Sequence, residues 1–542
     1  MPGMLLSLRI TEEMMRPILK NKLYLYLTEF FAGMAVMAVE LGASRLLAPY
    51  FSSSQIVWTI IIATIMIAMA LGNVFGGRSA DKDPNPDKLY RRLLIAAVWI
   101  AMIPALGKYV ILGITGLLVI TVSHNLLVAA AFLACMILFV FPCFLLGTCT
   151  PSLVRYTISS ADDSGRTAGS LGACNTVGSI LGTFLPTFVT IPAVGTAVTF
   201  FIFSGVLLII ALVYFLSSKL PRMRIPCAAA LLLFLLAAIF GNGRSFAFWE
   251  TDLAYEGESV YNYLQVKDTP GSTILSTNVL FGVQSITMKD NSLTGMYYDY
   301  ALAAPVMARQ AKRMLVLGMG TGTYARQCLQ YFAGMEITGV EIDEKITELA
   351  RIYFDAPREA EVVTYDGRAY LAADSSRYDV IMVDAYQDIT IPFQMSSVEF
   401  FTAVRDHLRE GGVMVVNMNL RSSAKDGINA CLSDTIASVF PHVLTVDVPG
   451  STNRVLFALS EAFSREDFEA EAAALEDISL KNLLLKTGEM LTPYLSSGLV
   501  LTDDRAPVEL LGMQAIDEVI AEELVYYKKM FDLYGIEGLL QS

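Results

Sequence analysis

Three acidic residues, Glu341, Asp366 and Asp384, each close a short apolar run that is typical of a buried strand. A fourth such run, 314–317, leads into the glycine-rich segment 318–323. Ligands bind parallel sheets in the crevice beyond the carboxyl ends of the strands. We therefore expect the three carboxylates and the glycine-rich segment to surround one pocket.

The types of these residues indicate a nucleoside ligand. The loop contains Gly318, Gly320 and Gly322, which let the backbone approach a ligand closely. Glu341 follows the first glycine by 23 residues, near the ~20 typical of an acid that accepts hydrogen bonds from ribose hydroxyls. Asp366, followed by Gly367, can accept a hydrogen bond from an adenine amine. Thr323 stands where a dinucleotide-binding fingerprint has a glycine, which disfavours a dinucleotide.

The elements that must hold these residues alternate between strand and helix. Strands are predicted at 314–317, 337–340, 362–365, 380–383 and 413–417, with helices ending near 332 and covering 344–354 and 396–408. This alternation indicates parallel strands joined by crossover helices. Two further strand-like runs, 442–448 and 455–459, fit the antiparallel edge of a methyltransferase-type sheet. We therefore predict a Rossmann-like nucleoside-binding catalytic domain over 301–542.

The segment before this domain, 246–300, has a different pattern. Short strands with intervening turns are predicted at 259–266, 273–276, 282–289 and 296–298. The segment is therefore predicted to be a small β-rich region at the start of the catalytic part.

The first half of the chain has the composition of a membrane domain. Of the 542 residues 54% are hydrophobic and 17% charged, whereas soluble domains have about 25% charged residues. Residues 1–250 hold 17 Lys and Arg against 10 Asp and Glu, and the remainder holds 22 against 42, a net charge of −20. Runs of about 20 apolar residues can span a bilayer. They occur at 23–48, 55–77, 125–149, 167–190, 196–217 and 225–241, with an interrupted run at 89–123.

These runs predict a multi-pass α-helical membrane domain over 1–245 with seven or eight spans. The expected location is the cell membrane, with contact to the lipid bilayer. The catalytic domain is assigned to the cytoplasmic side, although seven spans would place it outside and eight inside, so the side stays open.

Several classes of function are excluded. The acidic second half would repel phosphates, so we expect no nucleic-acid partner. The sequence has three histidines and no two cysteines separated by two intervening residues, so we expect no metal site.

The sequence resembles the spermidine synthase (polyamine aminopropyltransferase) family. In the second half the resemblance rests on GMGTG from Gly318, VEID from Val340, YDG from Tyr365, YDVIMVD from Tyr378 and LTDDRAPVE from Leu501. ESVY from Glu258 and GVQ from Gly282 resemble the family's amino-terminal β-hairpin region. In the first half, VELGASRLLAP from Val39, ALGNVFGG from Ala70 and NTVG from Asn175 resemble its membrane-fused branch.

The resemblance implies an aminopropyl transfer from decarboxylated S-adenosylmethionine to putrescine or another small polyamine, leaving methylthioadenosine. No tightly bound cofactor is implied. Asp384 would accept a proton from the attacking amine and orient it. The nucleoside part of the donor would contact Asn262, Gly318, Gly320, Gly322, Glu341, Asp366 and Gly367. The amine substrate and the aminopropyl group would contact Gln284, Tyr298, Asp299, Thr321, Tyr386 and Asp388.

The sequence departs from the family pattern near the amine. Thr321 stands where the family carries an acid that holds the donor's amine, and Tyr298 replaces the usual histidine. Two alternatives therefore stay open. One is an S-adenosylmethionine-dependent methyltransferase, and the other is a transporter or sensor whose second half only binds a nucleoside or polyamine. A homodimer also stays open.

Overall fold

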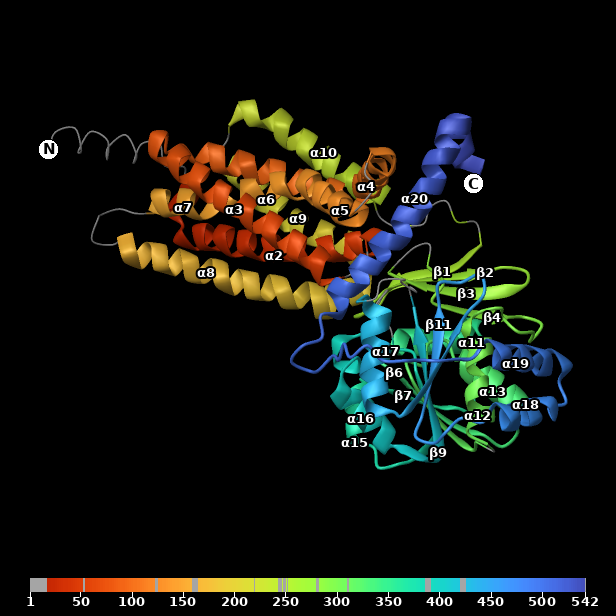
Figure 1. Ribbon diagram of the computed structural model, residues 1–542. Helices are drawn as coiled ribbons and strands as arrows, with labels where there is room; N and C mark the ends of the chain where they lie inside the picture. The colour runs from red at the N-terminus through yellow and green to blue at the C-terminus, as the bar shows by residue number, and fades with distance from the viewer. Residues whose placement is uncertain are drawn as a thin grey trace, which may run out of the picture. The chain divides into compact units, whose positions relative to one another are not determined.

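The chain folds into two compact units, 1–249 and 250–542, in a computed structural model. The structure describes residues 17–51, 54–121, 125–157, 164–218, 220–241, 246, 250, 252–278, 282–309, 311–385, 391–419 and 426–541. Figure 1 labels the helices and strands of the two units.

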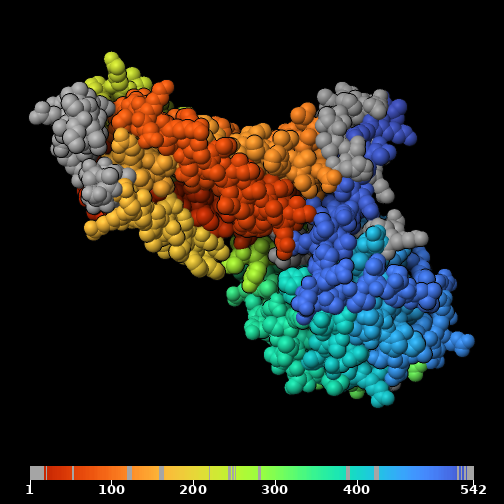
Figure 2. Space-filling model, turned by 60° about the vertical axis from the view of Figure 1, so that its left-hand side comes forward, coloured from red at the N-terminus to blue at the C-terminus, as the bar shows by residue number. Residues whose placement is uncertain are grey.

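The first unit is a bundle of long apolar helices. They are α2 (Lys22–Phe51), α3 (Gln55–Lys82), α4 (Pro86–Thr121), α5 (Leu126–Leu138), α6 (Val140–Gly147), α7 (Cys149–Thr157), α8 (Ser164–Leu185), α9 (Ile191–Ser217) and α10 (Arg224–Gly241). The predicted interrupted run at 89–123 lies in the single helix α4, which contains Pro104. Helix α8 lies along the outer edge of the bundle (Figures 1 and 2).

Small residues allow α8 to pack closely on α2. A Cβ added to Gly178 would lie 2.0 Å from the carbonyl oxygen of Phe30, and one added to Gly182 would lie 2.2 Å from that of Met34. Only glycine permits this approach of two helix backbones. From one contact to the next, the residue number rises by four in both helices, so α8 runs in the same direction as α2.

Helix α9 runs in the opposite direction along α2. The Tyr24 hydroxyl donates to the carbonyl oxygen of Ile210 at 2.6 Å, whereas Gly42 faces the ring of Phe200. The chain therefore reverses between α8 and α9. The non-helical residue Gly195, with φ of 80°, lies in this stretch, where an L side chain would be strained.

The described residues contain five helical runs that are long and apolar enough to cross a membrane, and a sixth if the bent pair Leu126–Leu138 and Val140–Thr157 forms one span. This is fewer than the seven or eight spans predicted from the sequence. The predicted segments 167–190 and 196–217 lie in one helical run, Ser164–Ser217, and counting its two arms separately, together with the bent pair, gives seven. The two arms of that run point in opposite directions.

The second unit begins with a four-stranded antiparallel sheet in the order β1-β2-β3-β4. Its strands are β1 (Leu253–Glu258), β2 (Tyr263–Asp268), β3 (Ser272–Thr277) and β4 (Ser285–Met288). The strand predicted at 296–298 is wrong, because these residues lead into α11 (Tyr297–Ala301). The Asp299 carboxylate accepts hydrogen bonds from the backbone N–H groups of Thr294 and Gly295, which fixes the turn before that helix.

The main sheet has eight strands in the order β12-β10-β11-β9-β8-β5-β6-β7. Five are parallel: β5 (Arg313–Leu317), β6 (Glu336–Glu341), β7 (Glu361–Thr364), β8 (Tyr378–Val383) and β9 (Leu408–Met418). The others, β10 (His442–Asp447), β11 (Arg454–Leu459) and β12 (Thr492–Pro493), form an antiparallel edge. This is the α/β fold expected from the alternating pattern.

Helices flank both faces of this sheet. They are α12 (Ala303–Met307), α13 (Thr323–Tyr331), α14 (Glu344–Tyr353), α15 (Gly367–Ala373), α16 (Val398–Asp406), α17 (Ile428–Val439), α18 (Arg465–Ala473), α19 (Ile478–Met490) and α20 (Val508–Gln541). Buried apolar side chains form a separate core on each face of the sheet.

The strand register sets the position of the site. Leu317 pairs with Val340 on one side and with Val383 on the other. The residues directly after these three positions are Gly318, Glu341 and Asp384, so they lie in a row at one edge of the sheet.

Candidate active site

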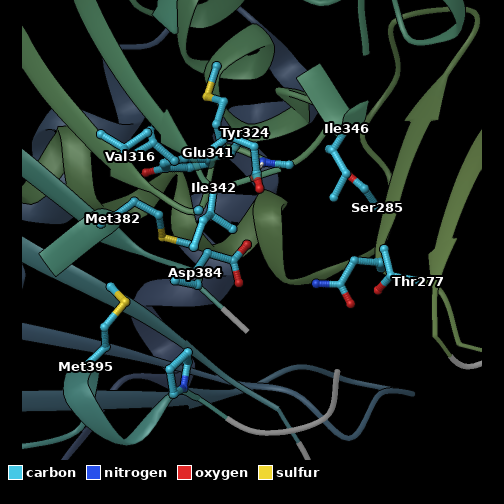
Figure 3. A pocket seen from close by; sticks show the side chains of 18 of the residues that line it. Thr277, Ser285, Val316, Tyr324, Glu341, Ile342, Ile346, Met382, Asp384 and Met395 are labelled. Carbon is cyan, nitrogen blue, oxygen red and sulfur yellow. Dashed lines mark hydrogen bonds between the residues drawn. The ribbon is translucent and has the colours of Figure 1, made fainter. Parts of the chain in front are cut away.

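A cavity of about 220 Å³ opens at this edge of the sheet (Figure 3). Its lining includes residues at the ends of β5, β6, β7 and β8, together with Thr277 and Ser285 from the four-stranded sheet. The predicted site residues that line it are Asn262, Gln284, Tyr298, Gly318, Gly320, Glu341, Asp366, Gly367 and Asp384. The fold therefore brings together residues that are more than 100 positions apart in the chain.

The glycine loop forms one wall of the cavity. Gly318 has φ of 88°, and a Cβ there would lie 2.5 Å from the carbonyl oxygen of Asp384. Gly320 has φ of 55°, and its N–H donates to Oε2 of Glu341 at 2.8 Å. The loop is thus held against both acids by its backbone.

Glu341 is a buried carboxylate with acceptor capacity left for a ligand. Its Oε2 accepts from Gly320 and its Oε1 accepts from the N–H of Asp343 at 3.1 Å. Each oxygen has a second lone pair. Burial raises the pKa of Glu341, and the two backbone N–H groups oppose that shift by stabilising the charged form. The arrangement suits a diol, which can donate two hydrogen bonds to one carboxylate.

Asp366 closes β7 and caps the next helix. Its Oδ1 accepts from the N–H of Ala369 at 2.8 Å, as expected for the residue before α15. Exposed side chains of Tyr365 and Ile342 lie beside it on the cavity wall.

Asp384 is a partly buried acid of the cavity, and two donors hold it. Its Oδ2 accepts from the Tyr297 hydroxyl at 2.5 Å, and its Oδ1 accepts from Nδ2 of Asn417 at 2.9 Å. Burial raises the pKa of Asp384 to about 7, and the charge of Glu341 adds to this shift. The two donors act in the opposite direction. A carboxyl that titrates near neutral pH suits general acid–base chemistry.

Sequence reasoning missed Tyr297 and Asn417. The sequence pattern places Tyr297 in a strand, and nothing in its sequence context separates it from its neighbour Tyr298. Asn417 closes the predicted strand 413–417 next to the strand that ends at Asp384. That position at a strand end is the signal that could have identified it.

Tyr298 and Asn262 line the cavity but bond mainly to protein. The Tyr298 hydroxyl donates to the carbonyl oxygen of Gln284 at 3.1 Å. The Asn262 amide donates to Asp343 at 2.9 Å and accepts from Asn278 at 2.7 Å. Both side chains therefore shape the wall of the cavity.

Three other predicted residues do not line the cavity. Asp299 accepts from Thr294, Gly295 and Gln327 and is 1% exposed, so its geometry argues against contact with a substrate. Thr321 is also buried, and its hydroxyl lies 2.5 Å from that of Ser285. Gly322 precedes α13 with φ of 82°. Tyr386 and Asp388 lie outside the described residues.

The charge of the cavity is one-sided. Glu341, Asp366 and Asp384 are its acids, and no Lys, Arg or His occurs among the described residues that line it. Within the described part of the chain, no group of three or more His, Cys, Asp or Glu side chains is placed to hold a metal ion. The cavity therefore favours ligands with positive charge.

Fold and site together define an α/β enzyme of methyltransferase-like fold with an acidic cavity at the carboxyl ends of its parallel strands. Residues 296–459 match the family model "Spermine/spermidine synthase domain". The chain is 55% identical over 349 residues to a probable polyamine aminopropyl transferase of Bifidobacterium longum (strain NCC 2705), covering 61% of this chain and 78% of that protein. It is 25% identical over 252 residues to the polyamine aminopropyltransferase of Vibrio vulnificus (strain CMCP6), covering 44% of this chain and 83% of that protein.

Solved structures also match part of the chain. One is a probable spermidine synthase from Corynebacterium glutamicum ATCC 13032, with a TM-score of 0.35 and 21% identity, covering 42% of this chain and 89% of that one. The chain belongs to the spermidine synthase (polyamine aminopropyltransferase) family, and the enzyme is an aminopropyltransferase.

Proposed function

We propose that this enzyme transfers the aminopropyl group of decarboxylated S-adenosylmethionine to putrescine or a related amine, and that its first unit anchors it in the cell membrane. The observation that carries the substrate proposal is the charge of the cavity. Three carboxylates lie at three strand ends, and the described lining contains no cationic side chain. A sulfonium donor and an amine acceptor are both cations, and both gain from this field.

The nucleoside part of the donor is assigned to the Glu341 side of the cavity. The ribose hydroxyls donate to the two Glu341 oxygens, which keep free lone pairs beside their backbone donors. The adenine lies near Asp366 and Gly367, between the exposed side chains of Ile342 and Tyr365. This pose directs the sulfur past the end of β5 toward the end of β8, where Asp384 lies.

Asp384 is assigned the role of proton acceptor. An ammonium nitrogen has no lone pair, so the acceptor amine must lose a proton before it can attack. Asp384 takes that proton, and the freed lone pair forms a bond to the donor carbon next to sulfur. The carbon–sulfur bond breaks, and its electron pair stays on sulfur, which becomes the neutral thioether of methylthioadenosine.

The donor is proposed to be the decarboxylated form. The carboxylate of S-adenosylmethionine would enter a cavity that already holds three acids and offers it no described cation. An unpaired charge in such a site is costly. A methyltransferase that uses the carboxylated donor is therefore disfavoured.

Binding of three compounds to the full-length protein tests the donor assignment. We expect methylthioadenosine and decarboxylated S-adenosylmethionine to bind clearly more tightly than S-adenosylmethionine in a calorimetric titration. Tighter binding of S-adenosylmethionine would contradict the proposal and favour methyl transfer.

The membrane proposal rests on the outer surface of the first unit. Large apolar side chains are exposed along α10 and α3, including Leu232, Leu235, Ile239, Met66 and Leu71. An aqueous surface would not carry such continuous apolar faces, whereas lipid matches them. We expect the full-length protein to sediment with membranes and to be released by detergent but not by high salt. Release by salt alone would contradict membrane insertion.

A further inference from the structure

A series of hydrogen bonds leads from Asp384 through two side-chain amides to one hydroxyl. Asn417 Nδ2 donates to Oδ1 of Asp384 at 2.9 Å. Asn453 Nδ2 donates to Oδ1 of Asn417 at 2.8 Å, and Oδ1 of Asn453 accepts from the Ser451 hydroxyl at 2.6 Å. Each link therefore donates toward the carboxylate.

The sheet topology produces this series. Strands β8, β9 and β11 are neighbours, and β11 runs antiparallel to β9. The carboxyl ends of β8 and β9 therefore lie beside the amino end of β11. Asp384, Asn417 and Asn453 occupy these three positions. Asn417 is 4% exposed and Asn453 is 9% exposed, so water has little access to their amides.

The direction of the Asn417 amide matters to Asp384. An ionised carboxylate only accepts hydrogen bonds, so it needs the N–H side of an amide. If the Asn417 amide turned over, its oxygen would face Asp384 and destabilise the charged form. A donor at Asn453 keeps the Asn417 oxygen pointed away from the site.

We propose that Asn453 is a positioning residue for aminopropyl transfer, whose side-chain N–H orients the Asn417 amide so that Asn417 donates to Asp384. This inference rests on the proposed role of Asp384 as proton acceptor. Asn453 itself does not line the cavity.

Other groups around Asp384 define what the test must hold constant. Tyr297 from α11 and Glu341 from β6 influence its proton affinity, and the charge of Asp384 in turn raises the pKa of the neighbouring Tyr298. None of them contacts Asn453 in the hydrogen bonds that the described residues make. A change at Asn453 therefore reaches Asp384 through Asn417.

The test is the pH profile of turnover for Asn453→Asp in the full-length enzyme. The carboxylate introduced by this substitution can only accept, so the Asn417 N–H turns toward it and leaves Asp384. Loss of this hydrogen bond disfavours the charged form of Asp384 and so raises its pKa. We therefore expect the acidic limb of the pH profile of turnover to move to higher pH by about one unit or more. Thr452→Ala, at an exposed position of the same turn, is the matched control and leaves the limb in place.

A second comparison separates an effect through Asn417 from a direct effect of the new charge. In an Asn417→Ala background, Asn453→Asp should produce no further shift. Methylthioadenosine binding, which needs Glu341 but not Asn453, reports whether each variant is folded. An unshifted limb in a variant that binds methylthioadenosine normally would overturn the proposal, as would an equal shift in the Asn417→Ala background. Failure of the Asp384 assignment would be distinct, because Asp384→Asn would then retain full turnover.

Discussion

At the scale of single residues, the reacting end of the cavity depends on keeping one carboxylate poised between two charge states. Asp384 is partly buried and lies near Glu341, and both conditions favour its neutral form. Tyr297 and Asn417 donate to it and favour the charged form. The balance places its titration near neutral pH, where it can both accept a proton and release it again.

Removing that charge should stop the chemistry but preserve nucleoside binding. We predict that Asp384→Asn lowers kcat by about 10²–10⁴, the usual contribution of a positioned acid–base group. Asparagine keeps the shape of the side chain, so the dissociation constant for methylthioadenosine should stay nearly the same. A rate equal to that of the unsubstituted enzyme would remove Asp384 from the mechanism.

The same residue should set the pH dependence. Its pKa is raised to about 7, so the ionised, proton-accepting form grows as pH rises through 7 and is lost as pH falls. We predict that kcat rises between about pH 6 and pH 8 with a limb near the pKa of Asp384. A profile that is flat across this range would contradict the assignment.

A substitution at Glu341, unlike one at Asp384, should weaken the binding of methylthioadenosine. Glu341→Gln keeps an oxygen for the Gly320 N–H but removes the charge that we propose accepts the ribose hydroxyls. We predict that methylthioadenosine binds about 10–100-fold more weakly, from the ~1.5–3 kcal/mol typical of hydrogen bonds to charged groups. Normal affinity in a calorimetric titration would show that the ribose binds elsewhere.

At the scale of elements, strand ends made the site predictable. Each of Glu341, Asp366 and Asp384 closes a strand, so the parallel topology alone places them at one edge. Side-chain partners depend on packing that a linear pattern does not contain. Asp299 illustrates this, because its carboxylate accepts hydrogen bonds from the N–H groups of Thr294 and Gly295 and does not line the cavity.

Helix packing in the first unit also depends on individual residues that periodicity does not identify. The sequence pattern shows apolar runs, but it does not show that Ser164–Ser217 reverses direction within one helical run. The contacts of Gly178 and Gly182 with α2 give the direction of one arm, and the contacts of Tyr24 and Gly42 with α9 give the opposite direction of the other.

The close approach of α8 to α2 can be tested within one helix. A Cβ at Gly178 would collide with the carbonyl oxygen of Phe30, whereas one at Gly172 meets nothing within 4 Å. We predict that Gly178→Ala lowers the thermal midpoint of the detergent-solubilised protein, since overpacking costs about 1–3 kcal/mol. Gly172→Ala is the matched control and should leave the midpoint unchanged. Equal midpoints for the two variants would contradict the packing of these helices.

At the scale of the whole molecule, composition predicted the division of the chain better than it predicted the interior of either part. The jump from an apolar, basic first half to an acidic second half marks two units. The family resemblance and the alternation of strands and helices then predicted the α/β fold of the second unit and the edge of the sheet that carries the cavity. The surroundings of Asp384 were harder to predict, because Thr321 and Asp299 do not line the cavity and Tyr297 was not recognised as a partner of Asp384.

The central claim is that one acidic cavity joins a decarboxylated adenosyl donor to an amine. The most direct measurement is a mass-spectrometric assay of the full-length enzyme with putrescine and either decarboxylated or intact S-adenosylmethionine. The account predicts an amine product heavier by one aminopropyl group, with an equal amount of methylthioadenosine, from the decarboxylated donor alone. Methylated putrescine formed from the intact donor, with no aminopropyl product, would contradict it.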